Sequence, residues 1–144
     1  MKRIFIVHGW GGNPEELLHK LLKGKFSKIG FEVVAPKMPD TNKPKIVDWV
    51  SHLNKVVINP DVKTYFIGHS IGCQAIMRYI ETLPEKQKIG GCIFIAGWFD
   101  LENLEDEEEE RIAKPWIEKP INFNKIKKIA RKISVYISSN EYYG

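Results

Sequence analysis

Short apolar runs that alternate with helix-like stretches set the strongest limit on the fold of this chain. The runs are continuous and rich in Ile, Val and Phe, which is typical of strands covered by helices on both faces. Their alternation with helical patterns predicts a parallel α/β sheet. The expected strands are residues 4–7, 31–35, 63–67, 92–96 and 134–138.

The segments between these runs predict the helices. We expect helices over residues 13–24, 44–57 and 70–83, and one or two more between 100 and 132 with a break at "KPWIEKP". Asn13, Pro14 and Glu16 form a good helix start, because Asn caps, Pro suits the first position and Glu completes a box-like spacing. The 144 residues contain no repeat or linker, so we expect one domain over 1–144.

Charge and cysteine content exclude several classes of protein. The net charge is +4, and an acidic run at 102–110 precedes a basic segment at 125–132. Ile126, Ile129 and Ile133 recur at helical spacing within the basic segment, which favours an amphipathic helix over a nucleic-acid site. No apolar run approaches the ~20 residues of a membrane span, and the first residues lack a signal-peptide pattern, so we expect a cytoplasmic protein. Cys73 and Cys92 form no CxxC pair, and we expect buried thiols and neither metal nor cofactor.

Residues 68–72, "GHSIG", fit the pattern G-x-S-x-G. An expected strand precedes the motif and an expected helix follows it, as a nucleophile turn requires. Such a turn holds serine in a strained conformation, and side chains at the flanking glycine positions would clash with it. Ser70 would therefore be a nucleophile, with the backbone N–H of Ile71 available to stabilise an oxyanion.

A glycine-rich loop, "VHGWGG" at residues 7–12, follows the first expected strand. It fails the dinucleotide pattern because Pro14 takes the place of the third glycine, and it also fails the P-loop pattern. We expect Gly9 to approach the substrate and the N–H of Trp10 to be the second oxyanion donor.

Five segments together resemble one known family. They are "HGWGG", "PKMPD", "GHSIGCQAIMRYIE", "KPWIEKPINFNKIKK" and "SVYISSNE". In this order they are similar to the small serine hydrolases of the α/β-hydrolase superfamily. The resemblance implies a three-layer α/β/α sandwich with a parallel sheet in the order 2-1-3-4-5, which the right-handed crossover rule also supports. It implies hydrolysis of esters or related acyl compounds through an acyl-serine intermediate at Ser70.

The resemblance also implies an acid and a base in that order along the chain. Glu141 stands where the family has its acid, and Asp100 is an alternative, as is the lack of a working acid. The family's base lies beyond a further strand, before a last helix. All histidines of this sequence precede the acid: His8, His19, His52 and His69. We therefore expect a hydrolase fold without the final strand and helix, and a weak or inactive chain.

Two other functions stay open at this point. A non-catalytic module that keeps the hydrolase fold to bind a partner is the main alternative, and a flavodoxin-like nucleotide binder is a weaker one. For a small acyl substrate we expect an aromatic pocket. Its candidate residues are Trp10, Trp98, Phe99 and Trp116, each of which could equally be a core residue. The last expected strand exposes Val135 and Ile137 at a sheet edge, which predicts either a homodimer through that edge or a cover from the tail of the chain.

Overall fold

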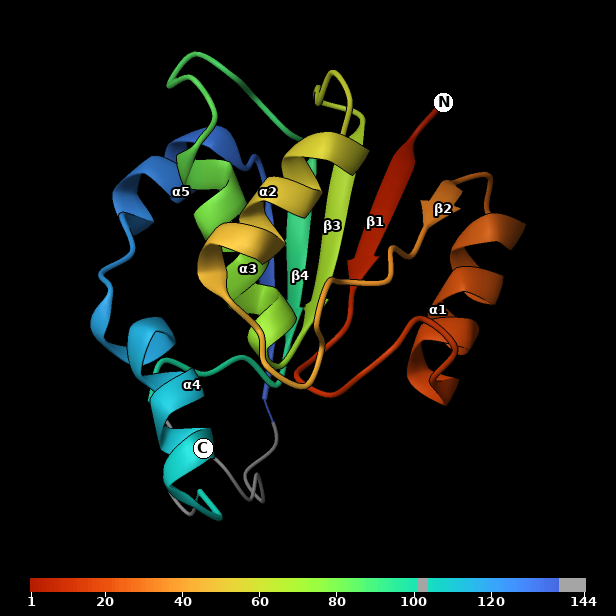
Figure 1. The fold of residues 1–144 in the computed structure, drawn as a ribbon. Coiled ribbons are helices and arrows are strands. Elements are labelled where there is room, and N and C mark those ends of the chain that lie inside the picture. The colour runs from red at the N-terminus through yellow and green to blue at the C-terminus, as the bar shows by residue number, and fades with distance from the viewer. Residues whose placement is uncertain (101–103, 138–144) are drawn as a thin grey trace.

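Five parallel strands form one sheet in the order β2-β1-β3-β4-β5 in a computed structural model, which describes residues 1–100 and 104–137. The order and direction of the strands confirm the expected topology (Figure 1). Each strand lies within about two residues of its expected position. The strands are β1 (Arg3–Val7), β2 (Glu32–Val34), β3 (Thr64–His69), β4 (Gly91–Ile95) and β5 (Ile133–Tyr136).

Helices cover both faces of the sheet, as Figure 1 shows. One face is covered by α1. The other face is covered by α2 and α3, and α4 and α5 lie on the same side. The helices are α1 (Leu17–Lys28), α2 (Ile46–Val56), α3 (Ile71–Glu81), α4 (Glu107–Glu118) and α5 (Phe123–Ile129). The expected three-layer sandwich is therefore confirmed for the described part of the chain.

The core is larger on the α3 face of the sheet. There α3 is buried over Ile71–Ile80, and the rings of Phe5, Phe66 and Tyr79 pack in series, with centroids 5.6 and 5.5 Å apart. On the α1 face a smaller cluster is centred on Ile4, Ile6 and Ile67. Because apolar burial is the main stabilising contribution, the α3 face anchors the elements that carry the serine turn.

Two helix boundaries differ from the sequence expectation. The first helix begins at Leu17, because residues 13–16 form a turn in which Asn13 Oδ1 accepts from the N–H of Glu15. It passes through Gly24 and ends near Gly30, whose φ of 92° suits a residue without a side chain. Helix α4 passes through Pro115 and ends at Glu118, so the expected break falls after the fifth residue of "KPWIEKP".

The side chain of Arg78, in α3, binds the carbonyl oxygens at the C-terminal end of the neighbouring helix α4. The last turn of α4 has no basic residue of its own. The Arg78 guanidinium, which is 5% exposed, instead donates to the carbonyl oxygens of Trp116 at 3.1 Å and Lys119 at 2.8 Å. Terminal carbonyls of a helix need such partners, so one buried cation holds α4 against α3.

Strand β5 lies at the edge of the described sheet, where Val135 is 62% exposed. Pairing of two copies through this edge stays a prediction.

Cys73 and Cys92 are buried free thiols, as expected, and burial raises the pKa of Cys73 to about 12. Among the described helices, none has the length and apolar character to cross a bilayer.

Candidate active site

Ser70 lies at a sharp turn between β3, which ends at His69, and α3, which begins at Ile71. Its backbone has φ 55° and ψ −125°, a region that costs a non-glycine residue of order 1–3 kcal/mol. A Cβ on Gly68 would lie 2.7 Å from the backbone N and Cα of Cys73, and one on Gly72 would overlap the carbonyl oxygen of Val7. The glycines therefore let the strained serine turn pack directly against α3 and β1.

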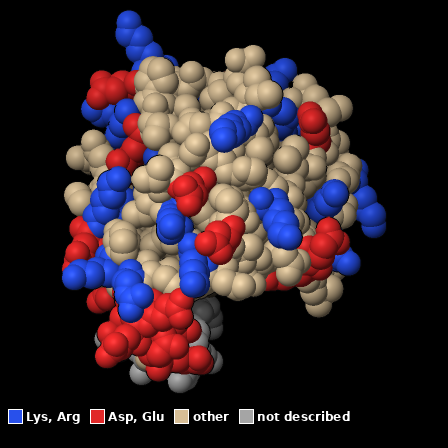
Figure 2. Space-filling view, in the orientation of Figure 1, with Lys and Arg blue, Asp and Glu red and all other residues tan. Residues whose placement is uncertain are grey.

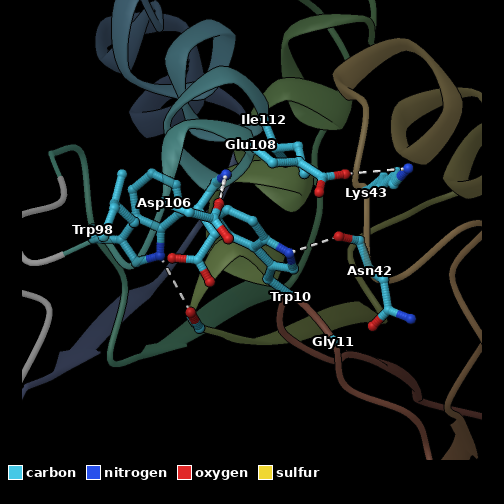
Figure 3. Close-up of a pocket in the computed structure, with 11 residues that line it drawn as sticks. Trp10, Gly11, Asn42, Lys43, Trp98, Asp106, Glu108 and Ile112 are labelled. Atoms are coloured by element: carbon cyan, nitrogen blue, oxygen red, sulfur yellow. Dashed lines mark hydrogen bonds and ion pairs between the residues drawn. The ribbon is translucent and has the colours of Figure 1, made fainter.

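The turn meets the loop after β1 at the carboxyl edge of the sheet. A Cβ on Gly9 would be only 3.1 Å from Cβ of Ser70, so the loop and the serine are in close contact. Trp10 follows Gly9 and lines the same cavity as Ser70. Its indole Nε1 donates to the carbonyl oxygen of Asn42 at 2.9 Å, which fixes the ring (Figure 3).

A tryptophan after β4 contacts the serine hydroxyl directly. Trp98 Nε1 donates to Ser70 Oγ at 3.2 Å, and Gln74 Nε2 donates to the carbonyl oxygen of Trp98 at 2.8 Å. Arg78 in turn donates to Gln74 Oε1 at 3.0 Å. Because an indole N–H can only donate, Oγ accepts this bond and its own proton is left to point elsewhere.

The cavity above Ser70 has a volume of about 550 Å³, which suits a small-molecule ligand. Trp10 and Trp98 both line the cavity, and Figure 3 shows Asp106 between them in this view. The lining residues come from the loops after β1, β3 and β4, the loop before α2, and α4. They are Trp10, Gly11, Asn42, Lys43, Ser70, Trp98, Leu104, Asp106, Glu108, Glu109 and Ile112.

The side of the cavity formed by α4 is acidic. Figure 2 shows the carboxylates of this region gathered at one end of the molecule. Asp106 caps α4 by accepting from the N–H of Glu109 at 2.8 Å, and acidic residues in a first helical turn are favourable. Lys43 pairs with Glu108 at 3.2 Å across the mouth (Figure 3). The other two lining carboxylates, Asp106 and Glu109, give this wall an excess of negative charge.

His8 is held in a neutral, bonded state that does not suit a catalytic base. The N–H of Met38 donates to His8 Nε2 at 3.0 Å, which assigns the proton to Nδ1, and Nδ1 lies 2.8 Å from the carbonyl oxygen of Gly9. Burial is the main cause that lowers the pKa of His8. With both nitrogens bonded to backbone, His8 braces the loop after β1.

The other three histidines do not line the cavity. His19 and His69 face each other on the α1 side of the sheet, with ring centroids 5.9 Å apart. His52 is on α2 and does not line the described cavity. Within the structurally described part of the chain, the cavity thus has no histidine among its lining residues.

The structure brings together some of the expected site residues and separates others. Ser70, Trp10 and Trp98 share the cavity, and Ile71 follows the serine. Trp116 is 1% exposed, and its Nε1 donates to the carbonyl oxygen of Pro44, so it takes the core position that the sequence left open.

Phe99 is 52% exposed and packs on Phe123 at 5.3 Å, and it is also not a lining residue. Asp100 is exposed after β4. Glu141 lies outside the described residues, so the choice of acid stays a prediction.

Sequence patterns did not reveal the residues that hold Trp98 or those that form the acidic wall. Gln74 and Arg78 lie four residues apart on a helix that is otherwise apolar and buried. Two polar residues at this spacing on a buried helix were the only sequence signal for a buried hydrogen-bond network at this position. Asp106 and Glu109 stood out only as part of an acidic run, because no local pattern tells that α4 folds back over the serine.

Comparisons with known proteins agree with this fold and show the family. A family model described as "Serine hydrolase" matches residues 4–141. The chain therefore belongs to this serine hydrolase family.

Two curated hydrolases are similar to this chain in sequence. Putative hydrolase YdeN of Bacillus subtilis is 29% identical over 97 residues, which are 67% of this chain and 51% of YdeN. Serine hydrolase RBBP9 of Rattus norvegicus is 31% identical over 121 residues, which are 84% of this chain and 56% of RBBP9. The chain thus spans about half the length of these curated relatives. The crystal structure of the B. subtilis ydeN gene product matches with a TM-score of 0.87 at 23% identity, over 99% of this chain and 74% of that one, and supports the fold.

The tight packing of the serine turn makes a direct prediction. Gly68→Ala places a Cβ against the backbone of α3, and we expect it to lower the free energy of unfolding by at least about 2 kcal/mol. Gly24→Ala is the matched control, because Gly24 lies inside α1 and a Cβ there would meet nothing within 4 Å; it should stabilise by about 0.5–1 kcal/mol. Urea unfolding measures both. Equal effects of the two substitutions would contradict the packing described for the turn.

Proposed function

We propose that this protein is a serine hydrolase for esters or related acyl compounds, with Ser70 as the nucleophile. The observation that carries the proposal is the position of Ser70, at a strained turn, lining the cavity and accepting a hydrogen bond from Trp98. Its Oγ attacks the acyl carbonyl carbon, the alcohol leaves with a proton, and water then hydrolyses the acyl-serine to release the acid and free Ser70.

The backbone N–H groups of Trp10 and Ile71 are the proposed oxyanion donors. Trp10 lines the cavity, and Ile71 is the first residue of α3, whose N-terminus favours negative charge. Among the described residues, no group accepts a hydrogen bond from either N–H. Free, rigid donors of this kind contribute most where charge develops in the transition state.

The 144-residue chain should be a slow enzyme. His8 is bonded through both ring nitrogens, and His69 packs against His19 of α1. None of these histidines is placed to accept the Ser70 proton, and a neutral serine hydroxyl is a poor nucleophile near pH 7. The same observation favours the second candidate, a binding module that uses the cavity without turnover.

The charge of the cavity favours neutral or cationic substrates. Glu108 is paired with Lys43, whereas Asp106 and Glu109 line the cavity without an ion pair to a lysine or arginine of residues 1–100 and 104–137. Like charges repel, so an anionic acyl group would approach Ser70 against this wall.

Turnover of 4-nitrophenyl acetate tests the proposed nucleophile. We expect slow hydrolysis by the 144-residue chain that falls only modestly in Ser70→Ala, because backbone oxyanion donors remain in both. Added imidazole should accelerate the unsubstituted chain more than Ser70→Ala, because it supplies the base that Ser70 lacks. Ser70→Ala also corrects for hydrolysis by free imidazole. Equal imidazole effects in both proteins would favour the binding module, and a fast Ser70-dependent rate without imidazole would mean that a base has been overlooked.

The acidic wall predicts a charge preference that isosteric variants can reverse. Asp106→Asn keeps a helix-capping side chain, and Glu109→Gln keeps the shape of the other carboxylate. We expect the double variant to raise the rate for a 4-nitrophenyl monosuccinate ester roughly threefold relative to the neutral acetate ester. Glu110→Gln, on the same helix but not lining the cavity, should leave this ratio unchanged. Equal ratios in the double variant and the unsubstituted protein would contradict the electrostatic explanation.

A further inference from the structure

Three side chains with metal-binding atoms meet on the α1 side of the sheet, and none of them lines the cavity. Glu16 is at the N-terminal boundary of α1, His19 is in its first turn, and His69 is the last residue of β3. One ligand atom from each lies within 4.8 Å of the others. The proposed hydrolase function does not use any of these side chains.

Three ring nitrogen atoms of the two histidines in this cluster are buried without hydrogen-bond partners. His19 is 1% exposed, and neither of its ring nitrogens has a partner in residues 1–100 and 104–137. Nδ1 of His69 is likewise buried and unpartnered over the same ranges. An unsatisfied buried polar group costs about 1–3 kcal/mol, so three such nitrogen atoms in one place need an explanation.

Glu16 is oriented toward the histidines by the turn before α1. Its Oε1 accepts from the backbone N–H of Asn13 at 3.2 Å, and its Oε2 lies 3.5 Å from Nδ1 of His19. The second distance is long for a hydrogen bond. The carboxylate is thus held by one oxygen and leaves the other directed at an imidazole, which is the arrangement that ligand-orienting contacts give at metal sites.

We propose that Glu16, His19 and His69 bind a divalent transition-metal ion of the zinc class. Imidazole nitrogen and carboxylate oxygen are the ligands that Zn²⁺ takes from proteins, at about 2.0–2.2 Å, in a tetrahedral arrangement. Ligand atoms at these lengths lie roughly 3.4 Å apart, so small side-chain rotations suffice to close this cluster around an ion. Water would take the fourth position.

Packing of two neutral imidazoles beside a carboxylate is the simpler explanation, but it accounts for less. The rings of His19 and His69 cross at 68° with centroids 5.9 Å apart, which is an edge contact that leaves nitrogen atoms without donors or acceptors. The sequence pointed to no such site, because its cysteine spacing argued against metal and the two histidines are 50 residues apart.

A metal here would be structural. It would join the start of α1 to the residue that precedes Ser70, so binding would stiffen the serine turn from behind without touching substrate. This consequence does not depend on whether Ser70 hydrolyses esters.

Titration calorimetry of the untagged, chelator-treated protein with Zn²⁺ tests the proposal. We expect one Zn²⁺ per chain and a melting temperature that rises by roughly 5–10 °C at saturating metal. Co²⁺ should give the intense visible absorption of a tetrahedral site. Glu16→Gln and His19→Gln should each weaken Zn²⁺ binding at least tenfold. His52→Gln, which removes a histidine outside the cluster, should bind as the unsubstituted protein does.

Glu16→Gln keeps the test valid if a histidine variant fails to fold, because the Glu16 side chain is 37% exposed and its loss leaves the core unchanged. Stoichiometric binding that is lost in Glu16→Gln and kept in His52→Gln supports the site. No binding at micromolar Zn²⁺, or binding that His52→Gln weakens as much as Glu16→Gln does, would overturn it. Ester turnover is a separate measurement, so failure of either proposal can be told from failure of the other.

Discussion

The strained backbone of Ser70, and the packing that maintains it, determine how the whole site is built. A φ of 55° is unfavourable for serine, and the turn persists because α3 is buried along its length and packs against β1 and β3. Gly68 and Gly72 allow that contact to be close. The packing of α3 on the sheet therefore offsets the conformational cost at Ser70 and holds its hydroxyl at the carboxyl edge of the strands.

A chain of hydrogen bonds extends this rigidity from the core to the serine. Arg78 binds the end of α4 and the side chain of Gln74, Gln74 holds the backbone of Trp98, and Trp98 donates to Ser70 Oγ. The guanidinium is buried, so its bonds are shielded from water and hold fixed geometry. The same network positions α4, whose carboxylates form one wall of the cavity. The orientation of Ser70 and the position of the acidic wall thus depend on one buried cation.

Sequence reasoning reached the fold because its signals are local and repeated. Apolar runs and the "GHSIG" turn predict the parallel strands, and the family resemblance together with the crossover rule predicts their order. It also placed Ser70, Trp10 and Trp98 near one another, since all three follow strand ends at one edge of a parallel sheet. It could not decide between pocket and core for Trp116, which fills the core beside Trp49, with ring centroids 6.0 Å apart. It also missed the Glu16, His19 and His69 cluster, because only the fold brings β3 against α1.

A crystal structure of the protein after long incubation with a fluorophosphonate would show directly whether Ser70 is the nucleophile. We expect phosphorus bonded to Oγ of Ser70, with the phosphonyl oxygen about 2.7–3.1 Å from the backbone nitrogens of Trp10 and Ile71. Trp98 would still lie beside the adduct. An adduct at another residue, or a phosphonyl oxygen directed away from both N–H groups, would contradict the assignment of this turn as the catalytic centre.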